Sequence, residues 1–584
     1  MFRAKRSSVL TRRLNLCIER IREWTRDNGF TISIGDGKTV AMHFCRYRST
    51  TCSIADSNMQ LFLGNDVIEY VVKKKFLGLI WDPKLNFKEH IKYLKKKCQS
   101  SLNIIKVLAH TDWGASTKTL LRLYRALVRS KLDYGCVVYR NASDTDLKTL
   151  DVIHNQGLRL CLGAFKSSPV ESLYVEANEP PLRERRQELL MKYGLRIRAN
   201  PSNPAYNAVF DLQYKDLYNA VVRNSRRNST RPRRRARSLA VELDELLNES
   251  GIDSSVIKPN FIPDFPVCYS VGIDVNFNLL QFDKNTTTDA VYDAAFKQIL
   301  SNNYKDHVHF YTDGSKKDDI SSYGGWSVYG VFSSRICKFS SIFTAEAEGI
   351  KRALSHIDVF PSDNGRFVIF SDSKSVLECI ENQTSKNVLI KEIIDTIHTI
   401  VFTSHKSIEF CWVPSHRGIE GNVEADRAAE RARGRAATAH YYLPYTDLYP
   451  VVEKFVHSKW QTRWIDTDLD RPNKLFSLQP LIRPFDTSGL TRREETVIHR
   501  LRIGHTRFTH RYLMEQTGPG QVPDSCCFCQ NGLLSVRHIL INCRHLIYIR
   551  RQYYIANSMR YLFENIPLKR IISFLRHIRI FSEI

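Results

Sequence analysis

Four acidic residues and one histidine have types and spacing that suit metal-assisted chemistry. Asp313 follows the apolar string HFYT, and Asp372 follows the apolar string VIFS. Glu346 lies near the start of the next predicted helix, while Asp426 lies in a later helix, ten residues after His416. Because neighbouring strands end at one edge of a sheet, we expect Asp313 and Asp372 to lie together, with Glu346 pointing to the same edge.

Acids gathered at one edge repel each other unless cations lie among them. Hard divalent cations prefer oxygen ligands, and Mg²⁺ suits a site with few protein ligands, with Mn²⁺ as a substitute. Two such ions about 4 Å apart suit an in-line phosphoryl displacement. Each acid also has an ordinary explanation: strand-end aspartates commonly form turns, Glu346 favours the helix dipole, and Glu348 is a rival two residues away.

The elements around these acids follow an α/β pattern that predicts a compact mixed sheet. Thr344 is the expected N-cap of the first helix. In chain order, we expect strands at 308–312, 324–332 and 335–341, a helix at 344–357, a strand at 367–370, helices at 374–380 and 389–401, a strand at 408–413 and a helix at 423–433.

Four strings in this region resemble ribonuclease H. They are YTDGS at 311–315, TAEAEGIKRAL at 344–354, FSDSKSVL at 370–377 and VPSHRGIEGNVEADRAA at 413–429. The resemblance implies the ribonuclease H fold and endonucleolytic cleavage of the RNA strand of RNA–DNA hybrids by two-metal-ion hydrolysis.

The same resemblance implies roles for individual residues. Asp313 would bridge both metals, Glu346 and Asp372 would each bind one, and Asp426 would complete the second site. His416 would help to move protons or release product. Selectivity for a hybrid requires contacts to 2′-hydroxyl groups. The candidates for substrate contacts are Ser373, Asn422 and Arg417.

Residues 1–200 are mainly helical from Phe87 onward and resemble the rear part of a reverse transcriptase from non-LTR retrotransposons of the jockey and I-element type. The matching strings are GFTISIGDGKTVAMHF (29–44), KFLGLIWD (75–82), HTDWG (110–114), LYRALVRSKLDYG (123–135) and HNQGLRLCLGAFKSSPVESLYVEANEPPL (154–182). The resemblance implies the end of the palm, a primer-grip hairpin and thumb helices.

The paired-aspartate YxDD box that such a polymerase needs is not among these strings. Asp318-Asp319 follows two lysines in a predicted hairpin and is no substitute. We therefore expect the chain to begin after the polymerase box and to have no polymerase activity.

A group of cysteine and histidine residues near the C-terminus has the spacing of a structural zinc site. Cys526, Cys529, His538 and Cys543 follow the pattern C-x2-C-x8-H-x4-C, and Cys527 is an alternative to Cys526. Free thiols beside a solvent-facing histidine are the rival interpretation. The preceding segment 499–512 carries four Arg, three His and two aromatic residues. It suits phosphate and base contacts, or else an ordinary amphipathic helix.

The chain has 584 residues and a formal net charge of +25. The segment 306–431 has 14 Lys+Arg and 18 Asp+Glu, which leaves a net charge of +29 for the remainder. The segment 223–237 holds eight Arg and no acid. This composition is typical of a solvated linker, a phosphate-binding arm or a nuclear localisation signal. The surplus predicts nucleic-acid partners, namely RNA–DNA hybrid, RNA and DNA.

No apolar run approaches the ~18 residues of a membrane span, and the N-terminus lacks the apolar core of a signal peptide. We therefore expect an intracellular protein of the nucleus or cytoplasm that does not bind membranes. The predicted divisions are palm remnant and hairpin (1–90), thumb-like helices (91–200), linker (201–303), ribonuclease H domain (304–435) and basic helical tail (436–584). The alternative to an active enzyme is a catalytically silent, nucleic-acid-binding remnant of a retroelement polyprotein.

Overall fold

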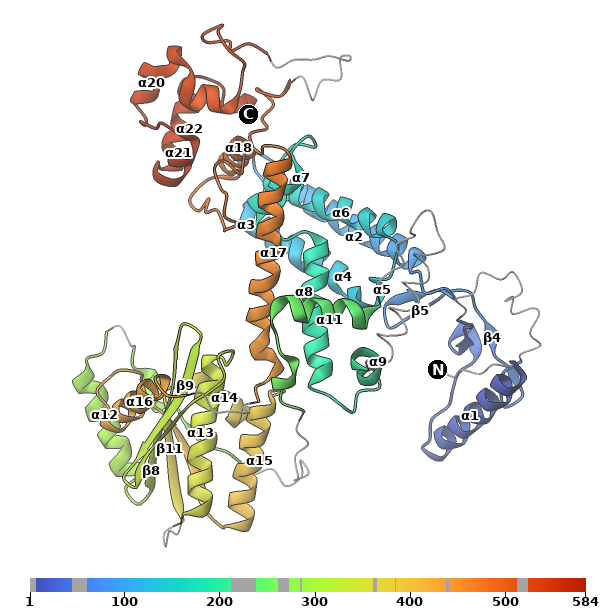
Figure 1. Ribbon diagram of the computed structural model, residues 1–584, viewed down its shortest axis with the longest axis vertical. Coiled ribbons are helices and arrows are strands. Elements are labelled where there is room, and N and C mark those ends of the chain that lie inside the picture. The colour runs from blue at the N-terminus through green and yellow to red at the C-terminus, as the bar shows by residue number, and fades with distance from the viewer. Residues whose placement is uncertain are drawn as a thin grey trace. The chain divides into compact units, whose positions relative to one another are not determined.

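In the computed structural model, the chain divides into two compact units (Figure 1). The described residues are 7–44, 60–211, 238–260, 272–283, 286–360, 365–383, 385–436, 442–511 and 524–584. The first unit comprises Met1–Leu189, Arg233–Ser238 and His457–Ile584. The second comprises Leu190–Pro232 and Leu239–Val456. The Arg-rich segment 223–237 lies outside the described residues.

The first unit begins with a helix and short strand pairs. Helix α1 (Ser7–Asp27) is followed by β1 (Val40–Ala41), which pairs in parallel with β4 (Glu69–Tyr70), and by the antiparallel pair β2 (Phe62–Leu63) and β3 (Asp66–Val67).

The segment 75–82, predicted as one strand, is a hairpin of β5 (Lys74–Phe76) and β6 (Leu79–Trp81). Its two turn residues, Leu77 and Gly78, both have positive φ, as a two-residue hairpin turn requires.

Helices then dominate the first unit. They are α2 (Lys88–Leu108), α3 (Thr117–Tyr124), the π-helical turn η3 (Arg125–Arg129), α4 (Ser130–Asp133), α5 (Cys136–Tyr139), α6 (Asp144–Leu162), α7 (Val170–Ala177) and the start of α8 (Leu182–Arg198). Their apolar faces share one core with residues from the far end of the sequence. The tail contributes Trp460, Trp464, Leu475, Ile482 and Ile503. The thumb-like helices and the start of the tail therefore bury a common set of side chains.

The tail has a second core of its own, built from α18 and the segments after it. Its elements after the end of α17 (Tyr449–Asp470) are α18 (Arg492–Ile503), η8 (His538–Asn542), η9 (Arg544–Leu546), α20 (Ile547–Arg551), α21 (Met559–Asn565), α22 (Leu568–His577) and η10 (Phe581–Glu583). The N-terminal region and the tail are thus both mainly helical, as predicted.

The second unit is built on a six-stranded mixed sheet with the order β10-β9-β8-β11-β12-β7. Strands β8 (Val308–Lys317), β9 (Ile320–Ser327) and β10 (Gly330–Arg335) are antiparallel. Strands β11 (Arg366–Ser371), β12 (Ser407–Trp412) and β7 (Val275–Asn276) extend the sheet in parallel from β8. The mixed α/β sheet predicted from the sequence is therefore confirmed.

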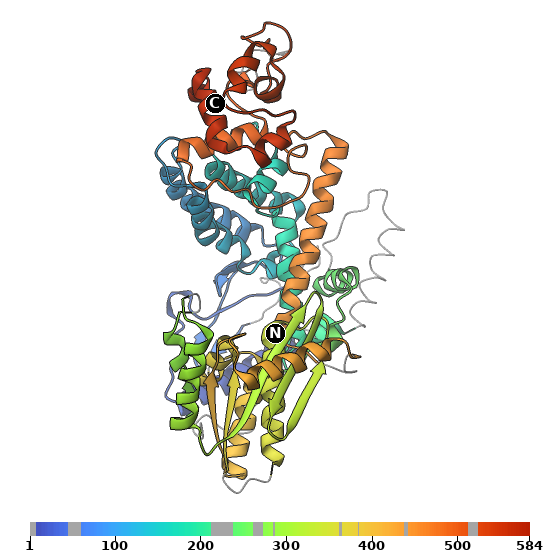
Figure 2. The ribbon, with the colours of Figure 1, turned by 90° about the vertical axis from the view of Figure 1, so that its left-hand side faces the viewer.

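Alternate residues of the central strands face two helical layers, as the two-residue repeat of a strand requires. Phe310, Phe367 and Phe410 face α13 (Ile342–Val359), α14 (Lys374–Asn382) and α15 (Val388–Thr403). Tyr311 and Phe370 face α12 (Asp289–Asn303) and α16 (Glu420–Arg433). Figure 2 shows the sheet from the side of α12 and α16.

Several predicted boundaries in this unit are wrong. The strands expected at 324–332 and 335–341 are β9 and β10, which meet at Val328 and Tyr329. The helix expected from Thr344 begins at Ile342, because the hydroxyl of Ser341 accepts the Thr344 backbone N–H as the N-cap.

The segment 201–303, predicted as a linker, is largely ordered in its described parts. It contains α9 (Tyr206–Phe210), α11 (Leu239–Ser250), η4 (Ser254–Val256), β7, η6 (Asn278–Gln281) and α12. β7 completes the sheet beside β12, and Phe296 of α12 packs against Phe370 of β11. The linker interpretation is therefore wrong for residues 272–283 and 286–303, which cover one edge and one face of the sheet.

Candidate functional site

The register of two parallel strands brings Asp313 and Asp372 together. The last pair in the ladder between β8 and β11 is Thr312 with Ser371, so each aspartate is the next residue of its chain. The prediction that Asp313 ends a strand is wrong, because β8 continues to Lys317 by pairing with β9. The two carboxylates therefore lie where the parallel part of the sheet stops.

Glu346 reaches this edge from the second turn of α13, and a glycine leaves room for it. A Cβ on Gly314 would lie 2.7 Å from the backbone nitrogen of Glu346 and 3.0 Å from its side chain. Ligand oxygens of Asp313, Glu346 and Asp372 all lie within 4.8 Å of one another. The structure thus brings three of the four predicted acids into one cluster, hereafter the carboxylate cluster.

Asp426 and His416 lie beside the carboxylate cluster. The His416 Nδ1 lies 3.5 Å from the Asp426 Oδ2, and the His416 side chain is 75% exposed. Helix α16, which carries Asp426, approaches β9 closely: a Cβ on Gly324 would lie 2.3 Å from the Ala429 backbone nitrogen. His416 has a φ of 55°, a left-handed conformation that is uncommon outside glycine.

Burial and mutual repulsion raise the pKa values of the cluster. Burial, followed by the charges of Asp372 and Asp426, raises the pKa of Asp313 to about 8. Burial and the charges of Asp372 and Asp313 hold the pKa of Glu346 well above its ordinary value. Burial also raises the pKa of Asp372, although Ser415 and His416 oppose the shift. Perturbed carboxylates of this kind are typical of functional sites.

Two oxygens of the cluster have no hydrogen-bond donor among the described residues. They are Glu346 Oε2 and Asp372 Oδ1, both buried. A buried carboxylate oxygen without a partner is costly, and a cation is the group that would satisfy several at once. The donor set is made only of carboxylate oxygens, which fits Mg²⁺ or Mn²⁺.

The three predicted substrate contacts lie in different environments. Ser373 is the N-cap residue of α14, one position beyond Asp372, and is half-buried. Asn422 is buried in α16, and its Oδ1 has no hydrogen-bond partner among the described residues. Arg417 forms an ion pair of 2.8 Å with Asp289 and stacks over Tyr292, so its charge is engaged with α12.

Two further residues that support the site were not identified from the sequence. The Trp412 indole donates to the Asp372 backbone carbonyl at 3.0 Å. Asp447, which is 7% exposed, accepts hydrogen bonds from the Ser341 backbone N–H and hydroxyl, both at 3.0 Å. Asp447 lies in the predicted tail, so no local pattern ties it to the helix that carries Glu346.

A family comparison agrees with this geometry. Residues 305–433 match the family model described as RNase H. These residues form a ribonuclease H domain. The match begins just before β8 and ends at the last residue of α16.

Two curated proteins are also similar to the chain. One is a Retrovirus-related Pol polyprotein from type-1 retrotransposable element R1 4 of Nasonia vitripennis, 26% identical over 24% of this chain and 36% of its own length. The other is an RNA-directed DNA polymerase from mobile element jockey of Drosophila funebris, 23% identical over 32% of this chain and 20% of its own length. The chain carrying this ribonuclease H domain is thus related to non-LTR retrotransposon polyproteins, and it matches about a third or less of their length.

The four predicted zinc ligands come together in the tail, away in sequence from the ribonuclease H domain. Ligand atoms of Cys526, Cys529, His538 and Cys543 all lie within 4.8 Å of one another. Cys526 is 1% exposed, whereas Cys527 is exposed. The fold therefore favours Cys526 over Cys527, and three thiols with one imidazole suit a tetrahedral zinc ion.

The segment 499–512, for which nucleic-acid contacts were one interpretation, is mostly buried or half-buried in its described part, although Arg507 and Arg511 are exposed. His499 and Arg502 bind the buried Glu176 carboxylate at 2.7 and 2.9 Å. Burial lowers the pKa of His505 to about 4 and that of His510 to about 3, so both rings are neutral at pH 7. These groups stabilise the interior of the unit and are not available to grip phosphates.

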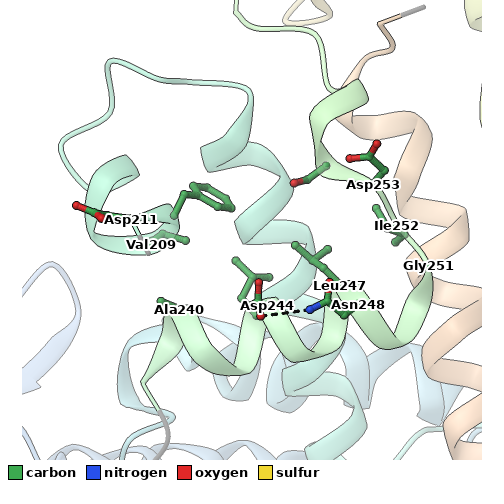
Figure 3. A pocket seen from close by; sticks show the side chains of 12 residues that line it. Val209, Asp211, Ala240, Asp244, Leu247, Asn248, Gly251, Ile252 and Asp253 are labelled. Carbon is green, nitrogen blue, oxygen red and sulfur yellow. Dashed lines mark hydrogen bonds between the residues drawn. The ribbon is translucent and has the colours of Figure 1, made fainter. Parts of the chain in front are cut away.

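A pocket of about 420 Å³ lies between α9 and α11, outside the ribonuclease H domain (Figure 3). Leu247 and Ile252 line its apolar side, and Asp244 on its rim accepts a hydrogen bond from Asn248. None of the carboxylate-cluster residues and none of the four predicted zinc ligands lines this pocket.

Among the described residues, no helix is long and apolar enough to cross a membrane.

Proposed function

We propose that the ribonuclease H domain of this chain cleaves the RNA strand of RNA–DNA hybrids by two-metal-ion hydrolysis. The observation that carries the proposal is the carboxylate cluster, in which ligand oxygens of three acids lie within 4.8 Å and two buried oxygens have no hydrogen-bond donor in the described part of the chain. Asp313, Glu346 and Asp372 would hold the ions, with Asp426 completing the second site. The chain is similar to an RNA-directed DNA polymerase and to a Pol polyprotein. This similarity supports RNA–DNA hybrid as the substrate, because such hybrids arise when RNA is copied into DNA.

When bound, two divalent cations supply activation of a water nucleophile and stabilisation of the charge that develops on the phosphate. The side chains of the protein supply the remaining functions. Gly314 lets α13 approach β8, so that Glu346 meets Asp313. We assign to His416, which is exposed beside Asp426, help in moving protons or in releasing the product. The expected products have a 3′-hydroxyl and a 5′-phosphate.

Selection of the hybrid requires contacts that a DNA duplex cannot offer. The 2′-hydroxyl of RNA is both a donor and an acceptor in the wide, shallow minor groove. Asn422 offers an amide whose buried oxygen has no partner among the residues that the structure describes, and Ser373 directly follows Asp372. We assign both to contacts with the RNA strand, whereas Arg417 serves the hybrid only if it leaves Asp289.

The test is cleavage of a hybrid whose RNA strand carries a 5′ label. We expect shortened RNA with Mg²⁺, none with EDTA, and no cleavage of the same RNA alone or of duplex DNA. Asp372→Asn should abolish cleavage, because a neutral amide does not replace a carboxylate ligand. Glu378→Gln is the matched control, since Glu378 is a half-exposed acid of α14 that pairs with Lys374.

Cleavage that persists in Asp372→Asn would contradict the proposal. Tight hybrid binding without cleavage by the unmodified chain would instead support the alternative, a silent nucleic-acid-binding remnant. We also propose that this chain does not polymerise DNA, since its palm-like strings contain no paired-aspartate box. Primer extension on an RNA template, with the hybrid cleavage assay as positive control, tests that proposal separately.

A further inference from the structure

The tail carries a strongly basic surface beside its Cys–His residues. Residues 524–584 contain nine Lys or Arg and three acids, and no acid lies between Asp524 and Glu564. Some cations elsewhere in the tail are paired: Arg483 and Arg560 with Glu564, and Arg576 with Glu494. For Arg544 and Arg551, no ion pair is found within the described part of the chain.

Arg544, Tyr548 and Arg551 are all exposed, and Tyr548 is 78% exposed. They lie along η9 and α20 at spacings of four and three residues, which places them on one side of the helical segment. The opposite side carries the buried residues Leu546 and Arg550. We call the three exposed residues the tail patch.

The Cys–His residues and a buried arginine hold the tail patch in place. Arg544 directly follows Cys543, whose thiol lies 4.0 Å from that of Cys526. The Arg550 guanidinium donates to the backbone carbonyls of Ile541 and Cys543. The helical segment is thus fixed to the loop that carries Cys543, and the exposed face needs no ordering before it binds a ligand.

The composition of the tail patch indicates its ligand. An exposed aromatic ring between two free guanidinium groups suits a chain in which phosphates alternate with flat bases. A duplex hides the faces of its bases, so stacking on Tyr548 requires a single strand. A membrane surface would instead require a wider apolar face than one exposed ring and its neighbour Ile547.

We propose that the tail patch binds single-stranded nucleic acid, with Tyr548 stacking on a base and Arg544 and Arg551 contacting the flanking phosphates. This function is separate from cleavage, because single-stranded RNA is not the proposed nuclease substrate. A failure of either proposal leaves the other standing.

The first test measures binding of a labelled oligouridine of about 16 nucleotides by fluorescence anisotropy. The full chain carrying Asp372→Asn excludes any contribution from cleavage, and about 0.3 M salt weakens purely electrostatic binding by the rest of the chain. Tyr548→Ala should weaken binding about tenfold, the loss of one base–aromatic stack. Tyr548→Phe should bind within about twofold of the parent, because it keeps the ring.

Tyr561→Ala is the matched control, since Tyr561 is a 46% exposed tyrosine of α21 beside an ion-paired arginine. It should leave binding unchanged. The double variant Arg544→Gln/Arg551→Gln should lower the slope of log affinity against log salt by about 1.4. Unchanged affinity in Tyr548→Ala, or an equal loss in Tyr561→Ala, would overturn the proposal.

A second measurement locates the contact directly. RNA containing 4-thiouridine, cross-linked to the full chain by light, should label the peptide that contains Tyr548. Cross-links found only outside residues 544–551 would contradict the assignment. Binding of anionic vesicles that is lost in Tyr548→Ala, without any change in RNA affinity, would identify the tail patch as a membrane contact instead.

Discussion

Ser341 donates both its backbone N–H and its hydroxyl to the carboxylate of Asp447, so a residue of the predicted tail fastens the start of the helix that carries Glu346. Asp447 lies 14 residues beyond the last residue of the family match, yet it belongs to the same compact unit. The part of the chain that supports the carboxylate cluster is therefore larger than the segment 305–433.

This relationship predicts the behaviour of Asp447→Ala. The change leaves two donors of Ser341 without their acceptor, which costs about 1–3 kcal/mol of unfolding free energy. We expect lower hybrid-cleavage activity and a higher Mg²⁺ requirement, because the start of α13 is less firmly held. Asp447→Asn, which keeps one acceptor oxygen, should lose less. Normal stability and activity in Asp447→Ala would show that the contact is dispensable.

The pKa of Asp313 predicts how metal-free protein responds to pH. Its folded value of about 8 exceeds the unfolded value of about 3.9, so between these limits the folded state binds the extra proton. The contribution of Asp313 to the free energy of unfolding is therefore largest below about pH 4. It falls by on the order of 1 kcal/mol per pH unit as the pH rises from there to about 8. Denaturant unfolding in EDTA measures the slope.

Asp313→Asn provides the control for this slope. Removal of one charge should make the metal-free protein more stable than the parent at pH 8 and flatten its pH dependence, although cleavage is lost. Added Mg²⁺ should stabilise the parent more at pH 8 than at pH 6, because deprotonated carboxylates bind the ion. A variant that is less stable than the parent at pH 8 would argue against repulsion within the cluster.

A pair of glycines tests how α16 positions Asp426. Gly324→Ala places a Cβ 2.4 Å from the Ala425 carbonyl, so the helix must move and we expect a loss of about 1–3 kcal/mol together with most of the cleavage activity. Gly349→Ala in α13 is the matched control, since the added Cβ would lie at an ordinary van der Waals distance of 3.5 Å from the Thr312 side chain. It should stabilise by about 0.5–1 kcal/mol. Thermal unfolding and hybrid cleavage distinguish the two.

Zinc content tests the Cys–His residues. One zinc ion per chain is expected by elemental analysis, and Cys529→Ser should lose it and lower the unfolding temperature of the tail. Cys527→Ser should keep both, because the Cys527 side chain is exposed. A chain that binds no zinc, or loses it in Cys527→Ser, would contradict the assignment of the four ligands.

The Glu176 carboxylate is buried in the first unit, and its removal should lower the free energy of unfolding strongly. Glu176→Gln leaves Arg502 buried without a counter-charge, and we expect a loss of about 3–5 kcal/mol. Glu171→Gln is the comparison, since the Arg463 it binds is partly exposed and the pair should contribute at most about 1 kcal/mol. Equal unfolding free energies for the two variants would mean that Arg502 finds another acceptor.

The sequence predicted the chemistry-bearing strands well because their apolar runs are followed directly by Asp313 and Asp372. It could not predict β7, since two residues carry no periodic signal and pair with a strand more than a hundred residues away. Composition alone misrepresented the segment 499–511, where Arg502 and His499 are satisfied by a carboxylate that is distant in sequence. The choice between Cys526 and Cys527 likewise depended on burial, which neighbouring identical residues do not reveal.

The unpaired oxygens of the carboxylate cluster also bear on the history of the gene. In a chain selected only for folding, an amide or apolar residue at these positions would be favoured, because it removes repulsion from a buried site. If the proposed nuclease is active, the need to bind metal ions accounts for acids at 313, 346, 372 and 426 that folding alone would not favour.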